Sequence, residues 1–170
     1  GYGINLRPLS MFAASAYRDD PCTRFKPHIL DQNIYDVVDP GLVAKMHKAI
    51  TVIQFKVEGQ IIRRHPEYGL NHRCLLEHVD FDKGTVEVDG KTYPMLDMKF
   101  PTIDPKDPLK LTEQEAELLQ TLKMSFRHSG LLHKHIKFLY SHGSMYKCCN
   151  NNLLYHGCIP LKKDGSFDDI

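Results

Sequence analysis

A chain of 170 residues with 42% hydrophobic and 25% charged residues has the composition of one ordinary globular domain with a buried core. Its 22 Lys and Arg balance 21 Asp and Glu to a net charge of +1, so no nucleic-acid partner is expected, because such a partner requires a basic surface. No apolar run reaches the roughly 18 residues of a membrane-spanning helix, and no membrane partner is expected either.

The start of the chain and its cysteines indicate its context. The chain begins Gly1-Tyr2-Gly3, without Met or an apolar leader, which predicts a processed or excised piece. The five cysteines are odd in number, and Cys148 and Cys149 are adjacent. We therefore expect free thiols rather than a disulfide framework, and a reducing, cytoplasmic location.

The first helices follow from periodicity. Residues 4–17 are expected to form a helix, and residues 19–36 an irregular segment. Asp39 is a favourable N-cap before Pro40, and the apolar residues that follow recur every three or four positions. This predicts an amphipathic helix of about six turns that ends at Pro66. Its apolar face comprises Leu42, Met46, Ile50, Ile53, Val57 and Ile61, and its lysines are expected in solvent: Lys45, Lys48 and Lys56.

A short helix is expected at 72–78. The hairpin signal that follows is strong, because Asp89-Gly90 suits a type I′ turn between residues 85–88 and 91–93. A Pro-rich linker covers 101–108.

The last part of the chain predicts two helices and two strands. Thr112 and Glu115 form a capping box that opens a helix, which Ser129-Gly130 breaks. A second helix runs to Gly143, a plausible C′ residue, and short strands at 145–149 and 153–156 surround three asparagines.

These elements predict an α+β fold that is mostly helical, with a β-hairpin and a short strand pair. Within a single domain we expect a mainly helical segment at 1–143, with the hairpin near 85–95. A strand pair follows at 144–161, and a polar tail at 162–170.

Histidines raise the question of a metal site, because five of the ten lie between 128 and 156. His133 and His135 are two residues apart and point to different sides of a helix, and the break at Ser129-Gly130 separates His128 from His135. These three and His142 are expected to be solvated or capping. Cys148, Cys149, His156 and Cys158 contain no Cys-x-x-Cys pair, so a zinc site is not expected.

His156 differs from the others because it ends the apolar strand 152–155 and precedes Gly157. A glycine there allows a sharp turn and the close approach of a ligand. Spacing alone leaves two interpretations of His156 open: a functional histidine, or a buried histidine held by hydrogen bonds. No nucleophile elbow, phosphate-binding loop or zinc-protease motif occurs, so no catalytic residue is assigned.

The string Asn-Leu-Leu-Tyr-His-Gly-Cys-Ile-Pro-Leu at 152–161 resembles a segment of the class III fructose-1,6-bisphosphatases. The likeness covers nearly the whole chain. It extends through residues 2–6, 19–22, 45–50, 53–56, 100–102, 111–113 and 125–126.

The resemblance implies a calcineurin-like metallophosphatase, an αββα sandwich with two divalent metals, of which manganese is the expected one. Of that family's ligand motifs only the His-Gly step is present, at His156-Gly157. His156 would bind the second metal and Gly157 would support its loop. The remaining ligands would lie before Gly1 and beyond Ile170, so the chain resembles an internal fragment without catalytic residues of its own.

The implied reaction is hydrolysis of the 1-phosphate of fructose 1,6-bisphosphate to fructose 6-phosphate, in gluconeogenesis. The isolated chain is expected to be inactive. The alternative is a non-catalytic helical interaction or regulatory module of the same ancestry, which intact ligand motifs in the flanking sequence would exclude. Because Leu153, Leu154 and Tyr155 are consecutive and apolar, we also expect the fragment to self-associate through 145–160 or to leave that stretch poorly ordered.

Overall fold

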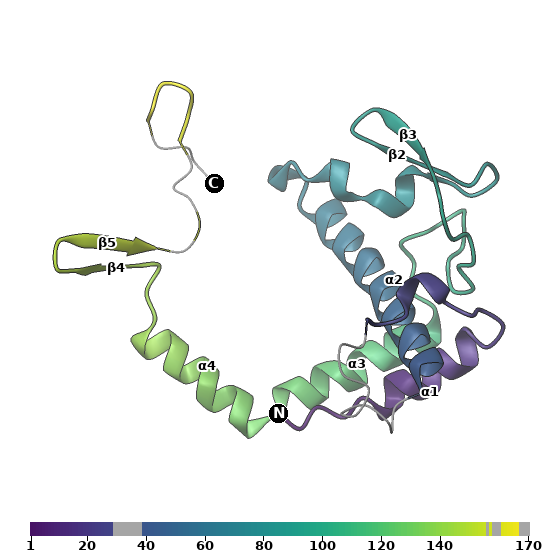
Figure 1. Ribbon diagram of the computed structural model, residues 1–170, viewed down its shortest axis with the longest axis horizontal. Coiled ribbons are helices and arrows are strands. Elements are labelled where there is room, and N and C mark those ends of the chain that lie inside the picture. The colour runs from purple at the N-terminus through teal and green to yellow at the C-terminus, as the bar shows by residue number, and fades with distance from the viewer. Residues whose placement is uncertain (29–38, 156, 158–160, 167–170) are drawn as a thin grey trace. The chain divides into compact units, whose positions relative to one another are not determined.

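The computed structural model describes residues 1–28, 39–155, 157 and 161–166. The chain divides into two compact units, a larger one of residues 4–126 and a smaller one of residues 1–3 and 127–170 (Figure 1). Within the described residues, both units combine helices with loops and short antiparallel strands, so the α+β class is confirmed. None of the helices described is long and apolar enough to cross a bilayer.

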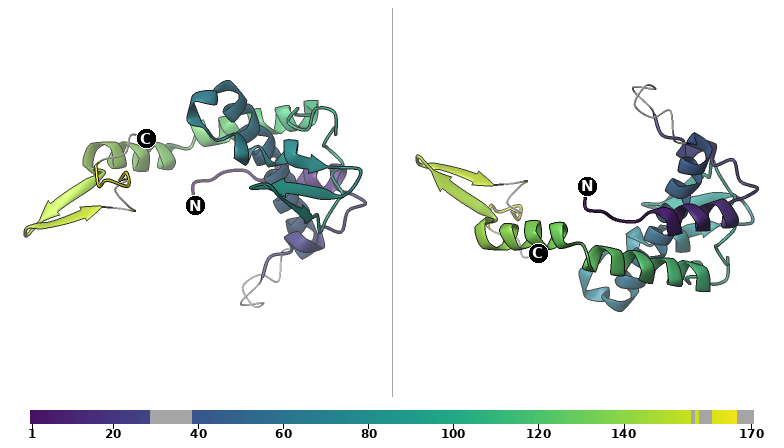
Figure 2. Two further views of the ribbon diagram at one scale, coloured as in Figure 1. Left: turned by 90° about the horizontal axis from the view of Figure 1, so that it is seen from above. Right: turned by 90° about the horizontal axis from the view of Figure 1, so that it is seen from below.

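The core of the larger unit lies between three helices. These are α1 (Arg7–Ala16), α2 (Pro40–Arg64) and α3 (Glu113–Arg127), whose last residue belongs to the smaller unit. Helix α1 packs along α2, as Figures 1 and 2 show from three sides. The buried apolar residues of this core are Leu9, Phe12, Ala13, Tyr17, Cys22, Ala44, Ala49, Ile53, Leu118 and Leu122.

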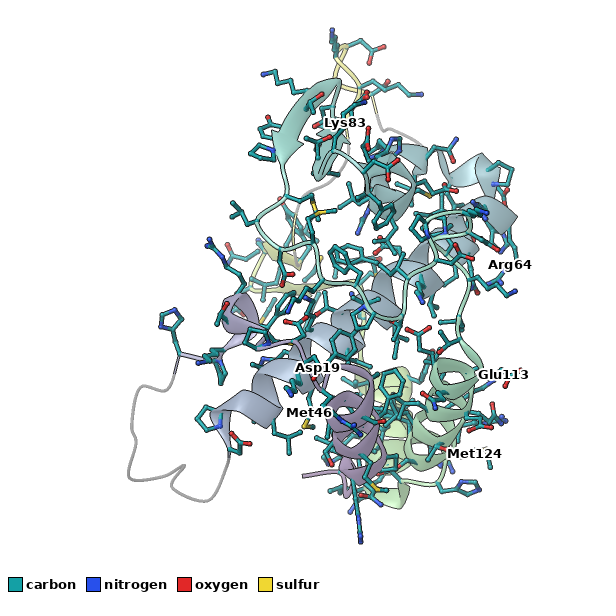
Figure 3. All side chains as sticks on the ribbon, turned by 90° about the vertical axis from the view of Figure 1, so that its right-hand side faces the viewer. Asp19, Met46, Arg64, Lys83, Glu113 and Met124 are labelled. Atoms are coloured by element: carbon teal, nitrogen blue, oxygen red, sulfur yellow. The ribbon has the colours of Figure 1, made fainter. Side chains whose placement is uncertain are left out.

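The predicted starts of α2 and α3 are confirmed by their capping hydrogen bonds, whereas α1 begins three residues later than the 4–17 helix expected. Asp39 Oδ1 accepts from the Gly41 N–H at 2.8 Å, at the beginning of α2. In the capping box, Thr112 Oγ1 accepts from the Glu115 N–H at 3.2 Å and Glu115 Oε2 accepts from the Thr112 N–H at 2.8 Å. Figure 3 labels Glu113, where α3 begins, and Arg64, where α2 ends.

A small antiparallel sheet follows α2 in the chain. The predicted hairpin is present as β2 (Thr85–Val88) and β3 (Lys91–Pro94), and its turn residues Asp89 and Gly90 have φ of 50° and 72°, as a type I′ turn requires. A two-residue strand β1 (Val79–Asp80) pairs with β2 and completes the order β1-β2-β3. Two residues are too few for an alternating pattern, which is why the sequence did not reveal β1.

The turns between α2 and the sheet are 3₁₀ helices. They are η3 (Pro66–Tyr68), η4 (Asn71–Arg73) and η5 (Leu75–His78), so the helix expected at 72–78 exists as two short 3₁₀ turns. A further one, η1 (Thr23–Phe25), lies in the segment predicted to be irregular, of which residues 29–36 are outside the described residues.

The smaller unit contains α4 (Gly130–His142), β4 (Tyr146–Cys149) and β5 (Asn152–Tyr155). Ser129 separates α4 from α3 as predicted: its Oγ accepts from the Leu132 N–H at 3.4 Å and donates to the Tyr2 carbonyl at 2.7 Å.

Gly143 differs from the expected left-handed C′ residue. It is the C-cap of α4 and its backbone is extended, with φ −76° and ψ 156°. Its N–H donates to the Leu139 carbonyl at 2.7 Å, and a Cβ at this position would collide with that same oxygen. The glycine therefore permits a close backbone approach rather than a positive φ.

Candidate functional site

The strand that precedes His156 belongs to a tight hairpin. Strands β4 and β5 are joined by Asn150 and Asn151, whose φ angles of 49° and 60° again make a turn with two left-handed residues. Asparagine tolerates this conformation better than other non-glycine residues, so the local sequence explains the turn. The turn is one residue shorter than the three-asparagine loop expected, because Asn152 pairs with Cys149.

The register assigns the hairpin side chains to two faces. Tyr146 is opposite Tyr155 and Cys148 is opposite Leu153, and these four side chains share one face, called here the aromatic face. The other face carries Lys147, Cys149, Asn152 and Leu154. The consecutive apolar residues of β5 lie on both faces of the hairpin, and the partner strand makes one face aromatic and the other mixed.

His156 and the residues 158–160 lie outside the described residues, so the predicted metal ligand is located only by its sequence position directly after β5. Gly157 is described and has φ +95°, a conformation that L side chains rarely adopt. Among the described residues, no atom lies within 4 Å of where a Cβ would stand, so the positive φ is the observed reason for a glycine here.

The other histidines of the smaller unit are exposed, as expected for His128, His133, His135 and His142. His135 Nδ1 lies 3.1 Å from the Tyr2 hydroxyl, and the His142 ring stacks on Phe138 with centroids 4.6 Å apart. Among the described residues, no group of three or more His, Cys, Asp or Glu side chains is arranged to hold a metal ion.

The four described cysteines are free thiols, two of them exposed and adjacent, Cys148 and Cys149, and two buried, Cys22 and Cys74. Burial is the main cause that raises the pKa of the Cys22 thiol to about 11, and the neighbouring Asp20 carboxylate adds to it. Cys158, the fifth thiol of the prediction, lies outside the described residues.

The expectation that the α2 lysines are solvated is wrong for two of the three. Lys48 and Lys56 are fully buried, whereas Lys45 is half-buried and donates to the Arg18 carbonyl at 2.8 Å. The helix is buried over a wider arc than its apolar stripe indicates, and Ile61 within that stripe remains 40% exposed.

Each buried lysine has carboxylate partners from other segments. Lys48 Nζ donates to Asp20 Oδ2 at 2.6 Å and to Asp97 Oδ2 at 2.7 Å. The same ammonium lies 5.2 Å and 5.8 Å from the ring centroids of Phe100 and Phe25. Lys48 thus connects the turn after α1 and the loop after β3 to α2.

Lys56 forms a second buried pair two turns further along α2. Its Nζ donates to Glu115 Oε2 at 2.7 Å and to the Thr102 carbonyl at 2.5 Å. Glu115 Oε2 is the same atom that caps α3, so one carboxylate oxygen serves the cap and the ion pair. Tyr17 lies nearby, with its hydroxyl 3.4 Å from Thr102 Oγ1, and burial raises the pKa of Tyr17 to about 12.

The Asp20 carboxyl is held in its charged form. Burial alone would raise the pKa of Asp20, but the hydrogen bonds from Lys48 Nζ and the Cys22 N–H outweigh it and lower the pKa below its ordinary value. This network was not evident from the sequence because its acids, Asp20, Asp97 and Glu115, are dispersed along the chain. The spacing Ala44, Lys48, Val52, Lys56 and Gly59 was the available signal, since small residues on the same face as the lysines indicate close packing.

The chain was compared with protein families and with curated proteins. The family described as Firmicute fructose-1,6-bisphosphatase matches residues 1–170. Among curated relatives, class 3 fructose-1,6-bisphosphatases of Listeria innocua and Alkaliphilus metalliredigens are each 53% identical, over 169 and 170 residues. That of Clostridium tetani is 54% identical over 167 residues.

These matches cover 98–100% of this chain but only 25–26% of each relative, so the chain spans about a quarter of their length. No solved structure matches it. The match along all 170 residues confirms the resemblance carried by the His156-Gly157 segment, and the chain belongs to the Firmicute fructose-1,6-bisphosphatase family.

Proposed function

We propose that this chain is a segment of a metal-dependent phosphatase that hydrolyses the 1-phosphate of fructose 1,6-bisphosphate, giving fructose 6-phosphate and phosphate. The observation that carries the proposal is the family match along all 170 residues, together with relatives named fructose-1,6-bisphosphatase class 3. The complete protein would have a calcineurin-like αββα fold, of which residues 1–143 form a mainly helical insert, 144–161 the ligand-bearing strand pair and 162–170 a polar tail.

Within that protein, we assign to this chain one metal ligand, the imidazole of His156. Among the described residues no group of side chains is arranged to hold a metal ion, which supports assigning the remaining ligands to the rest of the protein. When bound, a pair of divalent ions, with manganese the expected metal, activates water and stabilises charge on the phosphoryl oxygens. This chain would also position that ligand. The pairing of β4 with β5 fixes the end of β5, and Gly157, at φ +95°, turns the backbone directly after His156.

The test replaces His156 in the full-length protein that contains this chain. His156→Ala is expected to lower phosphate release from fructose 1,6-bisphosphate by about 100-fold or more and to reduce the bound manganese, because a lost ligand weakens the metal and misplaces the attacking water. His133→Ala, an exposed histidine on α4, is the matched control and should leave both quantities unchanged.

Normal turnover and normal metal content in His156→Ala would show that this histidine is structural. The isolated 170-residue chain, assayed with added manganese, should release no phosphate. Turnover by that chain comparable with the full-length enzyme would overturn the assignment of the other ligands to sequence outside it.

A further inference from the structure

The smaller unit has many large apolar side chains and buries none of them among its described residues. Among the described residues of the smaller unit, only Ser129 is buried, and Leu132 is half-buried. By contrast Phe138 is 60%, Leu139 62% and Tyr140 88% exposed. A folded unit normally hides most such residues, and apolar patches that stay exposed mark interaction sites.

Helix α4 is amphipathic, and no other described element of the smaller unit covers its apolar side. Leu132, Ile136 and Leu139 recur at spacings of four and three, which places them on one face, and Tyr140 follows Ile136 by one turn. Lys134 lies on the opposite face, and Lys137 lies on the side of the helix away from Leu139. Because a helix gains most of its stability from packing such a face, α4 has the pattern of a helix that packs against another part of a protein.

The hairpin shows the same property in a sheet. Its aromatic face, Tyr146, Cys148, Leu153 and Tyr155, is exposed along both strands, with Tyr146 61% and Leu153 50% accessible. Within the described residues β4 and β5 pair only with each other, so each strand retains an open edge. A two-stranded hairpin is marginally stable in water and normally requires a further strand or a packed face.

We propose that the aromatic face and the apolar face of α4 are docking surfaces for the part of the same polypeptide that lies outside these 170 residues. The matched relatives are about four times as long as this chain, since it spans 25–26% of their length, so enough polypeptide exists to cover both faces. A segment of the same chain is tethered beside these faces and needs no second molecule, which favours it over another copy. The segment must present apolar side chains and at least one strand edge. This inference rests on family membership and not on the proposed reaction.

Cys148 and Cys149 provide a test at adjacent positions, because Cys148 lies on the aromatic face and Cys149 on the other, and both are exposed in the chain described. In the native full-length protein, a maleimide reagent should label Cys148 at least about tenfold more slowly than Cys149, as expected for a side chain covered by packing. In urea the two rates should become equal.

Paired substitutions test α4 in the same full-length protein. Leu139→Ser should lower the melting temperature by about 4 °C or more, whereas Lys137→Ser, on the side of the same helix away from Leu139, should change it by less than about 1 °C.

Equal labelling of the two thiols in the native protein, or equal effects of the two serine substitutions, would overturn the proposal. Protection of Cys148 that disappears on dilution, as an oligomer dissociates, would identify a second copy as the occupant and would also overturn it. Neither labelling rate nor melting temperature measures enzyme activity. Failure of the proposed phosphatase function would therefore not contradict this inference, and failure of this inference would not contradict the proposed function.

Discussion

At the scale of single residues, the buried ammonium groups of Lys48 and Lys56 decide how the larger unit holds together. A buried ion pair need not add net stability, but removal of one partner leaves an uncompensated charge. Both pairs cross between segments distant in sequence, since Lys48 meets Asp20 and Asp97, and Lys56 meets Glu115. They therefore select one arrangement of α1, α2, α3 and the loop after β3.

Lys56→Ala should destabilise the 170-residue chain by about 3–5 kcal/mol, because Glu115 would remain fully buried without its cation. The double variant Lys56→Met with Glu115→Leu should lose less than the single variant, since no unpaired charge remains. Lys83→Ala is the control, because its pair with Asp80 is exposed to solvent, so its removal should leave the stability nearly unchanged. Urea unfolding measures the stability of all three variants. A loss in Lys56→Ala as small as that in Lys83→Ala would contradict the role given to the buried pair of Lys56 and Glu115.

Asp20 makes part of this stability dependent on pH. Its pKa is lower in the folded state than in the unfolded chain, where a carboxyl titrates near about 4, so its contribution is fully present above that pH. The contribution is lost as the pH falls through the lower, folded-state pKa. Asp20→Asn retains an acceptor for the Cys22 N–H but loses the charge beside Lys48.

Urea unfolding at several pH values checks this expectation. The wild type should be more stable than Asp20→Asn near about pH 7, and the difference should shrink steadily below about pH 4. Asp82→Asn, at an exposed turn position, should track the wild type throughout. A difference in unfolding free energy between the wild type and Asp20→Asn that stays constant down to about pH 2 would contradict a contribution from the charge of Asp20.

At the scale of elements, local signals predicted most of the fold and few of its long-range contacts. The sequence predicted the local features: the caps at Asp39 and Thr112, the Asp89-Gly90 turn and the break at Ser129. Each of them depends on residues no more than four positions apart in the chain. The sequence did not predict the burial of Lys48 and Lys56, because their partners lie 28 to 59 residues away in the chain. The candidate site followed the same rule: the hairpin before His156 was predicted, whereas its single aromatic face required the register between strands.

Gly59 shows how closely two elements approach. A Cβ at this position of α2 would stand 2.6 Å and 2.8 Å from the two methyl carbons of Leu109, which is itself buried. Gly59→Ala should therefore destabilise the chain by about 1–2 kcal/mol, because overpacking exceeds the gain of up to about 1 kcal/mol in helix propensity.

Thermal unfolding of Gly59→Ala alone and combined with Leu109→Ala separates these effects. If crowding is the cause, Gly59→Ala should be less harmful, or even stabilising, once Leu109 has been shortened. Gly130→Ala, in the first turn of α4 with nothing near its Cβ position, is the control and should not destabilise. An additive double variant would show that Leu109 moves aside freely.

At the scale of the whole molecule, the two units differ in what they complete. Residues 4–126 bury a core of their own between three helices, whereas the described residues of the smaller unit bury no apolar side chain. The larger unit thus has a core of its own, and the smaller unit carries the apolar surface for which we proposed a covering segment.

This difference predicts how the isolated chain behaves. Without the polypeptide that we expect to cover it, the aromatic face should bind the same face, or an open strand edge, of another copy, because exposed apolar strands associate. Light scattering should then show an average mass that rises with concentration. Leu153 and Leu154 are adjacent, 50% and 54% exposed, and on opposite faces of the hairpin, which makes them a matched pair. Leu153→Ser should suppress the association and Leu154→Ser should affect it less; a strictly monomeric chain, or equal effects of the two substitutions, would refute the aromatic face as its cause.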